Sequence, residues 1–176
     1  MPMFNMAFKC EPLKTGEASI RMEMVADLAA EALFGESSEL YLRLYEQGLI
    51  DSSFGGGFET VDGCAMLLCS GDSDDPEAVR EAIEAQAEKL ARRGIPEEDF
   101  LRMKRSALGR RIRDLDSFDS TCFRLCAYHF SHFDYFLFPA VYRDIQEAEV
   151  LDFLARAVTP ERCALSVIDP VSSEEA

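Results

Sequence analysis

The amino-acid sequence predicts an α+β protein, a two-layer sandwich in which several helices pack against a mostly antiparallel sheet. Apolar residues recur at helical spacing over most of the chain, whereas strand-like segments stand at its start, in its middle and at its end. Neither consecutive β-α-β units nor an internal repeat occurs, and this disfavours a doubly wound parallel sheet.

The first 48 residues are expected to hold one strand and two helices. The helices are indicated by apolar residues at i, i+3, i+4 and i+7 and by glycines placed where helices usually end. The expected bounds are a strand over Met3–Lys9, a loop over Glu11–Glu17, a helix from Ser19 to Gly35, and a helix capped by Ser37 or Ser38 that ends at Gly48.

A β-hairpin is expected next, with strands over Leu49–Val61 and Cys64–Ser70. The short connection Asp62-Gly63 favours a tight turn, because glycine accepts the positive φ that such turns require. Three consecutive glycines, Gly55-Gly56-Gly57, interrupt the first strand. They indicate either a bulge or a place where another backbone comes close.

Helices dominate the second half of the sequence, and a strand closes it. Asp75 followed by Pro76 is typical of a helix start. The expected elements are helices from Asp75 to Gly94, from Pro96 to Leu115, over Cys122–Phe133 with a start at Ser117 or Ser120, over Pro139–Asp144 and over Glu147–Ala157, and a strand over Cys163–Asp169. Residues 1–170 are expected to form a single domain, followed by a disordered tail over 171–176.

The amino-acid composition and the net charge disfavour some classes of binding partner. The chain has 176 residues, 33 of them acidic and 18 basic, which gives a formal charge of −15. Such a charge disfavours nucleic acid and anionic membranes as partners. The longest apolar runs fall short of the ~20 residues that span a bilayer, and the first residues lack the basic region of a signal peptide. Together with six scattered cysteines, read as reduced thiols, this predicts a cytoplasmic protein.

Two clusters of side chains have the composition of a binding site. Cys122, Cys126 and His129 share one helix face and could be read as zinc ligands, but we expect the two cysteines to be core residues, with His129 at the core margin. Eight basic residues fall between Arg92 and Arg113. We expect them to form a solvated helix face that pairs with nearby glutamates, and binding of an anionic partner is the alternative.

Several short motifs resemble the non-catalytic second half of pitrilysin/insulinase-type zinc peptidases, in particular bacterial two-domain members. One is the helix entry from Ala32 to Tyr41, and another is the turn Leu44-Tyr45-Glu46-Gln47-Gly48-Leu49-Ile50. The third is the helix start Gly94-Ile95-Pro96-Glu97-Glu98-Asp99-Phe100, which continues to Lys104. The motifs keep the family's order, and the resemblance extends from Phe4 to Asp169.

The resemblance implies an α/β sandwich of the kind found in metallopeptidase halves and LuxS. It also implies a zinc-bearing homologous half, in the same polypeptide or in a partner subunit, with which this domain encloses a peptide substrate. No zinc or other cofactor is expected in this chain, because it contains no H-x-x-E-H motif, and alone it should be inactive. The alternative is a catalytically inert assembly subunit of the same fold.

The resemblance also indicates where the peptide chamber would lie. Active relatives hold the substrate backbone with an arginine and a tyrosine of this half, but the matching positions here are Tyr45 and, for the tyrosine, Asp51 or Ser52. Substrate polarisation by this half is therefore either lost or supplied differently. We expect the chamber surface to comprise Tyr45, Asp51, Ser52, Gly55, Gly56 and Gly57.

Overall fold

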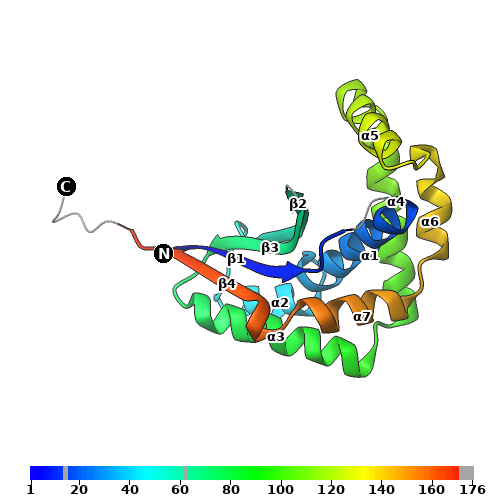
Figure 1. The fold of residues 1–176 in the computed structure, drawn as a ribbon. Coiled ribbons are helices and arrows are strands. Elements are labelled where there is room, and N and C mark those ends of the chain that lie inside the picture. The colour runs from blue at the N-terminus through cyan, green and yellow to red at the C-terminus, as the bar shows by residue number, and fades with distance from the viewer. Residues whose placement is uncertain (14–15, 62, 171–176) are drawn as a thin grey trace.

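A four-stranded antiparallel sheet forms one layer of the computed structural model, which describes residues 1–13, 16–61 and 63–170 (Figure 1). The strands are β1 (Met3–Cys10), β2 (Gly55–Val61), β3 (Cys64–Asp72) and β4 (Cys163–Ile168). Their order in the sheet is β2-β3-β1-β4, so the first and last strands of the chain are neighbours and β2 lies at an edge. The predicted α+β sandwich is confirmed.

Helices make up the second layer and lie on one side of the sheet in Figure 1. The α-helices are α1 (Glu17–Phe34), α2 (Glu39–Glu46), α3 (Pro76–Arg93), α4 (Glu97–Asp114), α5 (Phe118–Phe130), α6 (Phe138–Asp144) and α7 (Glu147–Ala157). Two short 3₁₀ turns, η1 (Tyr135–Leu137) and η2 (Pro160–Arg162), precede α6 and β4. Helix α5 projects farthest from the sheet.

The core lies between the sheet and α1. Side chains of a strand alternate between the two faces, so Phe4, Met6 and Phe8 of β1 all point toward the helices, and each is 0% exposed. From the other layer, Met24 and Leu28 of α1 are also fully buried. This packing explains why β1 is strongly alternating in sequence and why α1 carries apolar residues around much of its circumference.

Several local predictions are confirmed by hydrogen bonds at helix ends. The Ser38 hydroxyl accepts a bond from the backbone N–H of Tyr41 at the start of α2. The Asp75 carboxylate accepts one from the N–H of Ala78 at the start of α3, with Pro76 in the first turn. Gly63 has the positive φ expected between β2 and β3, whereas Asp62 and the predicted tail at 171–176 lie outside the described residues.

The strand predicted over Leu49–Val61 is wrong in its first part, because β2 begins only at Gly55. Residues 51–54 form a turn in which the Asp51 carboxylate accepts bonds from the N–H and hydroxyl of Ser53. The turn places the Phe54 ring in the core, about 6 Å from the rings of Phe4 and Phe34.

The glycines do not form a bulge, since Gly55, Gly56 and Gly57 pair one to one with Ser70, Cys69 and Leu68 of β3. Close backbone approach is confirmed at Gly56, where an added Cβ would lie 2.6 Å from the Leu68 carbonyl oxygen of β3, and the Phe34 ring comes equally close at 2.6 Å. At Gly55 and Gly57 a Cβ would meet nothing within 4 Å.

The interpretation of Cys122 and Cys126 as core residues is wrong. Helix α5 begins at Phe118, after its cap Ser117, and only Tyr128 is buried on it. Cys126 and His129 are exposed, and Cys122 is intermediate. The cause is the position of α5 at the margin of the fold, where one narrow side of the helix packs and the rest faces solvent.

Candidate functional site

A groove runs along the outer edge of β2, between this strand and helices α1, α4 and α5. Two cavities of about 510 and 550 Å³ make up the groove, and they share Asp27, Phe58, Arg111 and Arg124 as lining residues. Because β2 is an edge strand, its outward backbone N–H and C=O groups have no neighbouring strand in the described sheet.

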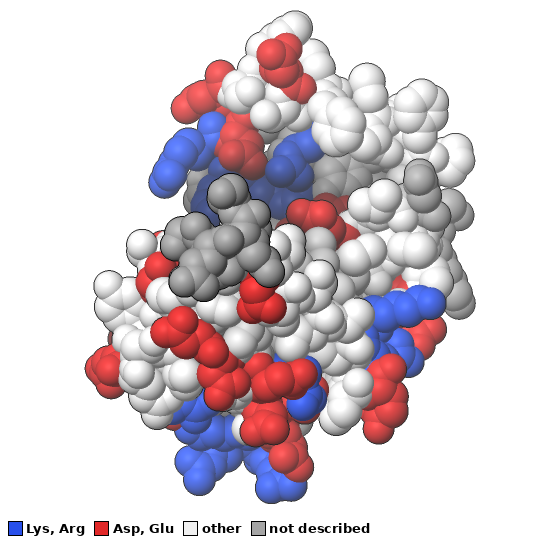
Figure 2. Space-filling model, turned by 90° about the vertical axis from the view of Figure 1, so that its left-hand side faces the viewer, with Lys and Arg blue, Asp and Glu red and all other residues white. Residues whose placement is uncertain are grey.

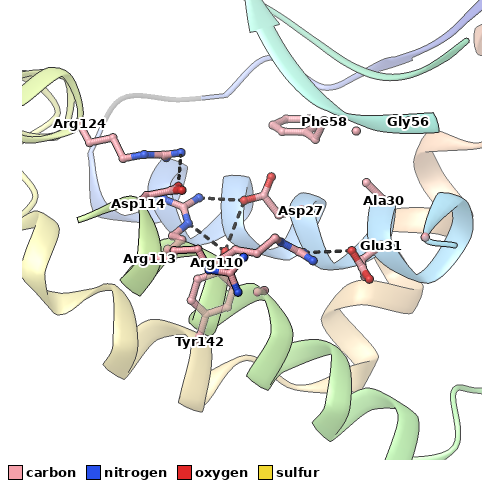
Figure 3. Close-up of a pocket in the computed structure, with 14 residues that line it drawn as sticks. Asp27, Ala30, Glu31, Gly56, Phe58, Arg110, Arg113, Asp114, Arg124 and Tyr142 are labelled. Carbon is pink, nitrogen blue, oxygen red and sulfur yellow. Dashed lines mark hydrogen bonds and ion pairs between the residues drawn. The ribbon is translucent and has the colours of Figure 1, made fainter. Parts of the chain in front are cut away.

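Arginines gather at the first of these cavities, next to Gly56 and Gly57 (Figure 3). Arg110 and Arg113 come from α4, and Arg124 comes from α5. Arg110 pairs with Glu31 at 3.0 Å, and its side chain is 49% exposed. Arg124 pairs with Asp114 at 3.3 Å and is 32% exposed. No ion pair is recorded between Arg113 and any described residue.

These arginines stand out on an acidic protein. In Figure 2, basic side chains collect in a hollow in the upper part of the molecule with acidic side chains beside them, and further acidic and basic side chains lie over the lower part of the same face. Together with Arg111, the cavity is lined by four arginines and three carboxylates, Asp27, Glu31 and Asp114. The expectation that the basic stretch is merely a solvated helix face is therefore incomplete, because three members of it line one cavity.

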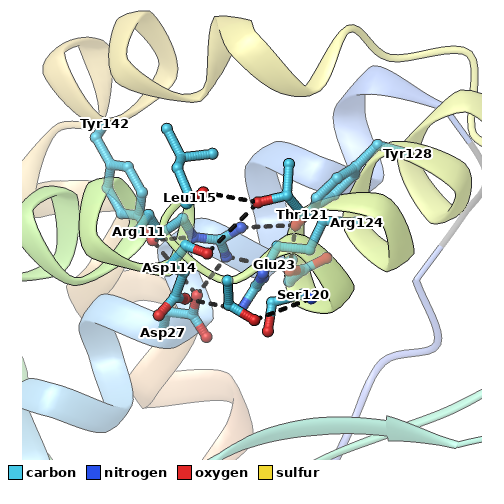
Figure 4. A network of polar contacts seen from close by, with 11 residues as sticks. Glu23, Asp27, Arg111, Asp114, Leu115, Ser120, Thr121, Arg124, Tyr128 and Tyr142 are labelled. Carbon is cyan, nitrogen blue, oxygen red and sulfur yellow. Dashed lines mark hydrogen bonds and ion pairs between the residues drawn. The ribbon is translucent and has the colours of Figure 1, made fainter.

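Arg111 has a different role, since its side chain is only 6% exposed and each of its guanidinium nitrogens is occupied (Figure 4). Nη2 donates to Asp27 Oδ2 at 2.8 Å and to Glu23 Oε1 at 3.2 Å. Nη1 donates to the Tyr128 hydroxyl at 2.8 Å, and Nε donates to the Tyr142 hydroxyl at 3.1 Å. The network joins α1, α4, α5 and α6, and it forms the floor of the groove.

The two tyrosines of this network remain protonated at neutral pH. Burial raises the pKa of Tyr142 to about 12, and burial also raises the pKa of Tyr128. Each hydroxyl can therefore accept from Arg111 and donate onward, Tyr128 to Glu23 at 2.7 Å and Tyr142 to Asp27 at 3.4 Å. The arrangement holds the buried arginine fully paired and makes it unavailable to a ligand.

The predicted chamber residues divide into two groups. Gly56 and Gly57 line the groove directly. Tyr45, by contrast, lies at the end of α2 with its ring stacked on Tyr41 at 5.9 Å, and Asp51 is engaged with Ser53 in the turn before β2. Tyr45, Asp51, Ser52 and also Gly55 line neither of the two cavities of the groove.

Sequence reasoning missed the acidic residues of α1 and Arg124 of α5 as parts of a site. Asp27 and Glu31 are four residues apart and so lie on one side of α1. This spacing could have been recognised in the sequence. Arg124 is ten residues from Asp114, across a helix break, and only the fold brings these two side chains together.

The described residues contain no group of three or more His, Cys, Asp or Glu side chains that could hold a metal ion. Likewise, no described helix is long and apolar enough to cross a bilayer.

Comparison with known proteins places this chain in a family of peptidase domains. Residues 1–107 match the family described as the peptidase M16 inactive domain. The chain is 27% identical over 163 residues to the uncharacterized zinc protease YmfH of Bacillus subtilis, which covers 92% of this chain and 37% of that protein.

Solved structures share the fold. An M16-like peptidase from Alicyclobacillus acidocaldarius superposes with a TM-score of 0.85 at 21% identity, over 94% of this chain and 40% of its own. The inactive peptidase domain of a zinc protease from Bordetella parapertussis gives 0.80 at 15% identity, over 98% of this chain and 92% of its own.

The protein is thus a peptidase-like α+β domain without a catalytic metal motif in its sequence. The chain belongs to the peptidase M16 family, as a non-catalytic, inactive domain. This confirms the resemblance to the second half of pitrilysin/insulinase-type peptidases. The chain spans well under half the length of the Bacillus subtilis relative.

Proposed function

We propose that this domain forms one wall of a peptide chamber whose other wall is a separate half that carries zinc. The observation that carries the proposal is the groove beside β2, where an open strand edge borders two cavities with shared lining residues. An extended peptide can add to such an edge through main-chain hydrogen bonds, while its alternate side chains enter the groove.

The zinc-bearing half is proposed to be a homologous domain, in the same polypeptide or in a partner subunit. The share of the Bacillus subtilis zinc protease that this chain covers, 37%, supports a partner of comparable size. Zinc would belong to that half alone. Residues 1–170 are proposed to act as one domain within the assembly.

The outer surface of α5 is proposed as part of the contact with the zinc-bearing half. Phe118, Phe123 and Phe130 are 81%, 74% and 80% exposed, although phenylalanine is usually buried. Clustered exposed aromatic residues mark protein–protein contacts, and α5 projects from the fold where a partner can reach it (Figure 1).

The surface at Tyr45, Asp51 and Ser52 is proposed to face the chamber without polarising the substrate. Tyr45 stands at the position of the family's arginine and supplies no guanidinium. Neither Asp51 nor Ser52, at the position of the family's tyrosine, supplies a phenol. The alternative function, an inert assembly subunit, requires the contact with the partner but no peptide in the groove.

A reducing, cytoplasmic location is also proposed, supported by six cysteines that are all free in the structure. The formal charge of −15 supports a partner other than nucleic acid or an anionic membrane.

The test is reconstitution with a homologous half that carries H-x-x-E-H. The two proteins are mixed, their association is measured by sedimentation, and cleavage of a quenched fluorescent peptide is followed. We expect a stable complex, zinc in the H-x-x-E-H half alone, and cleavage that requires both proteins and is abolished by a chelator.

The variant Phe118→Ser together with Phe130→Ser should weaken the complex without lowering the melting temperature of this domain, because both rings face solvent and line neither cavity of the groove. Chelator-sensitive cleavage by this chain alone would refute the assignment of roles. A complex that forms but never hydrolyses peptide would favour the inert assembly subunit.

A further inference from the structure

We infer that the groove selects acidic peptide segments, with a carboxylate of the peptide received by Arg113, Arg110 and Arg124. The inference rests on the proposed function, because it specifies which peptides the β2 edge holds. Three features of the structure lead to it: a guanidinium without an ion pair to any described residue, two partly exposed and exchangeable ion pairs, and a strand edge that fixes the position of the ligand.

Arg113 is the primary anchor. It is exposed, lines the cavity beside Gly56 and Gly57, and makes no recorded ion pair with the described residues. A guanidinium presents several N–H donors in one plane and binds carboxylates in a bidentate manner, so a carboxylate is the ligand group that it fits best.

Arg110 and Arg124 can join this anchor at little cost. Their present partners, Glu31 and Asp114, hold them in ion pairs that solvent reaches, and exposed pairs of this kind contribute only about 0–1 kcal/mol. A carboxylate entering between these arginines can therefore replace or share an existing partner. Arg111 takes no part, because its network already occupies it and its side chain is buried.

The rest of the groove offers apolar contacts to the peptide. Farther along β2, the second cavity is lined by Phe58, Thr60 and, from α5, Phe123 and Ala127. Side chains of an extended peptide project alternately, about 3.3 Å apart per residue along the strand. An acidic residue at the arginine end would thus be followed by apolar residues at the Phe123 end, with the backbone paired to β2.

The experiment measures binding of short fluorescein-labelled peptides to the intact chain by anisotropy. The probe carries glutamates in one half and valines in the other, in both orders, and two matched peptides carry glutamine or lysine in place of glutamate. We expect the glutamate peptide to bind at least about tenfold more tightly than the glutamine peptide, and the lysine peptide to bind most weakly. A version with methylated backbone nitrogens should lose binding, because it cannot donate to the edge strand.

Arg113→Glu should weaken binding of the glutamate peptide by about tenfold or more and leave the glutamine peptide unchanged. Arg105→Glu is the matched control, since Arg105 is an exposed arginine of the same helix that lines neither cavity. Arg124→Gln provides a second variant, which removes the positive charge and keeps a polar side chain. Circular dichroism melting of each variant shows whether it is folded.

Equal weakening by Arg113→Glu and Arg105→Glu would mean general attraction to the surface and would overturn the inference. Equal affinity for the glutamate and glutamine peptides, or no binding of either, would also overturn it. Competition by inorganic phosphate at the same concentration as the glutamate peptide would show an unspecific anion site, with the same consequence. Each of these results leaves the proposed function standing, which fails instead if the chain does not associate with a zinc-bearing half.

Discussion

Gly56 shows how a single missing Cβ is used within the domain itself. Its nearest neighbours, the Phe34 ring and the Leu68 carbonyl oxygen, would both lie 2.6 Å from an added Cβ. The glycine thus allows α1 to pack closely under an edge strand. This is an internal packing requirement, although the same residue also borders the groove.

Replacing Gly56 by Val should therefore destabilise the isolated domain by about 2–3 kcal/mol, through overpacking against Phe34. Gly57→Val is the matched control, because a Cβ there meets nothing within 4 Å, and β-branched residues are favoured in strands. Urea denaturation of both variants measures the difference in the free energy of unfolding. Similar midpoints for the two variants would contradict this explanation of Gly56.

At the same scale, Arg111 joins four helices, because it lies on α4 and its side chain donates hydrogen bonds to α1, α5 and α6. Arg111→Ala would leave Glu23 and Asp27 side by side without their cation, and Tyr128 and Tyr142 without a donor. We expect a loss of about 3 kcal/mol in the free energy of unfolding. Arg110→Ala, which removes a partly exposed pair with Glu31 and a hydrogen bond to the Ser106 hydroxyl, should cost about 1 kcal/mol. Equal losses in thermal melts of the two variants would show that the network is not the stabilising element.

At the scale of elements, regular periodicity made most of the fold predictable. β1, α1, α3 and α7 begin and end within a few residues of their expected bounds, since each has a buried face on one main layer. The failures fall where local polar groups or position in the fold decide the outcome. The Asp51–Ser53 turn shortened β2, and the marginal position of α5 left Cys126 exposed.

The candidate site was only partly predictable for a related reason. Gly56 and Gly57 were identified because three glycines in a strand are unusual. The arginines of α4 point in different directions around their helix. Helical periodicity alone therefore does not predict that they line one cavity. Only the approach of α5, which brings Arg124 to Asp114, and the burial of Arg111 reveal that they enclose one cavity.

The contact between α1 and α7 should respond to acid. Glu149 of α7 accepts two hydrogen bonds from Arg21 of α1, and the bond from Arg21 is the main reason that the pKa of Glu149 is lowered in the folded protein. A lowered folded-state pKa means that the stabilisation is present above the unfolded-state pKa of about 4.3 and is lost as pH falls through the folded-state value.

Glu149→Gln should accordingly be less stable than the parent at pH 7, by less than about 1 kcal/mol because the carboxylate is about one-third exposed. The gap should narrow as pH falls below about 4.3. Glu88→Gln serves as the control, since its pair with Arg92 lies within one exposed helix face. A gap between parent and Glu149→Gln that stays constant from pH 7 to about 3 would exclude this linkage.

The whole molecule carries an excess of 15 negative charges, and its recorded ion pairs are mostly at the surface. Self-repulsion of these charges destabilises the compact state, whereas exposed ion pairs contribute little to the free energy of unfolding. The two effects respond to salt in opposite directions, so the sign of the response shows which is larger. We argue that repulsion is larger, because it sums over the entire surface.

Raising sodium chloride from about 10 mM to about 200 mM shortens the Debye length from about 30 Å to less than about 10 Å. The melting temperature of the chain should therefore rise by a few degrees, on the order of 1 kcal/mol in stability. Arg111→Ala should show the same rise from its lower starting point, since the Arg111 network is largely shielded from solvent and salt screens it little. A fall in the parent's melting temperature with salt would mean that surface pairs outweigh the repulsion. A rise that disappears in Arg111→Ala would mean that the net charge acts through the groove network rather than over the whole surface.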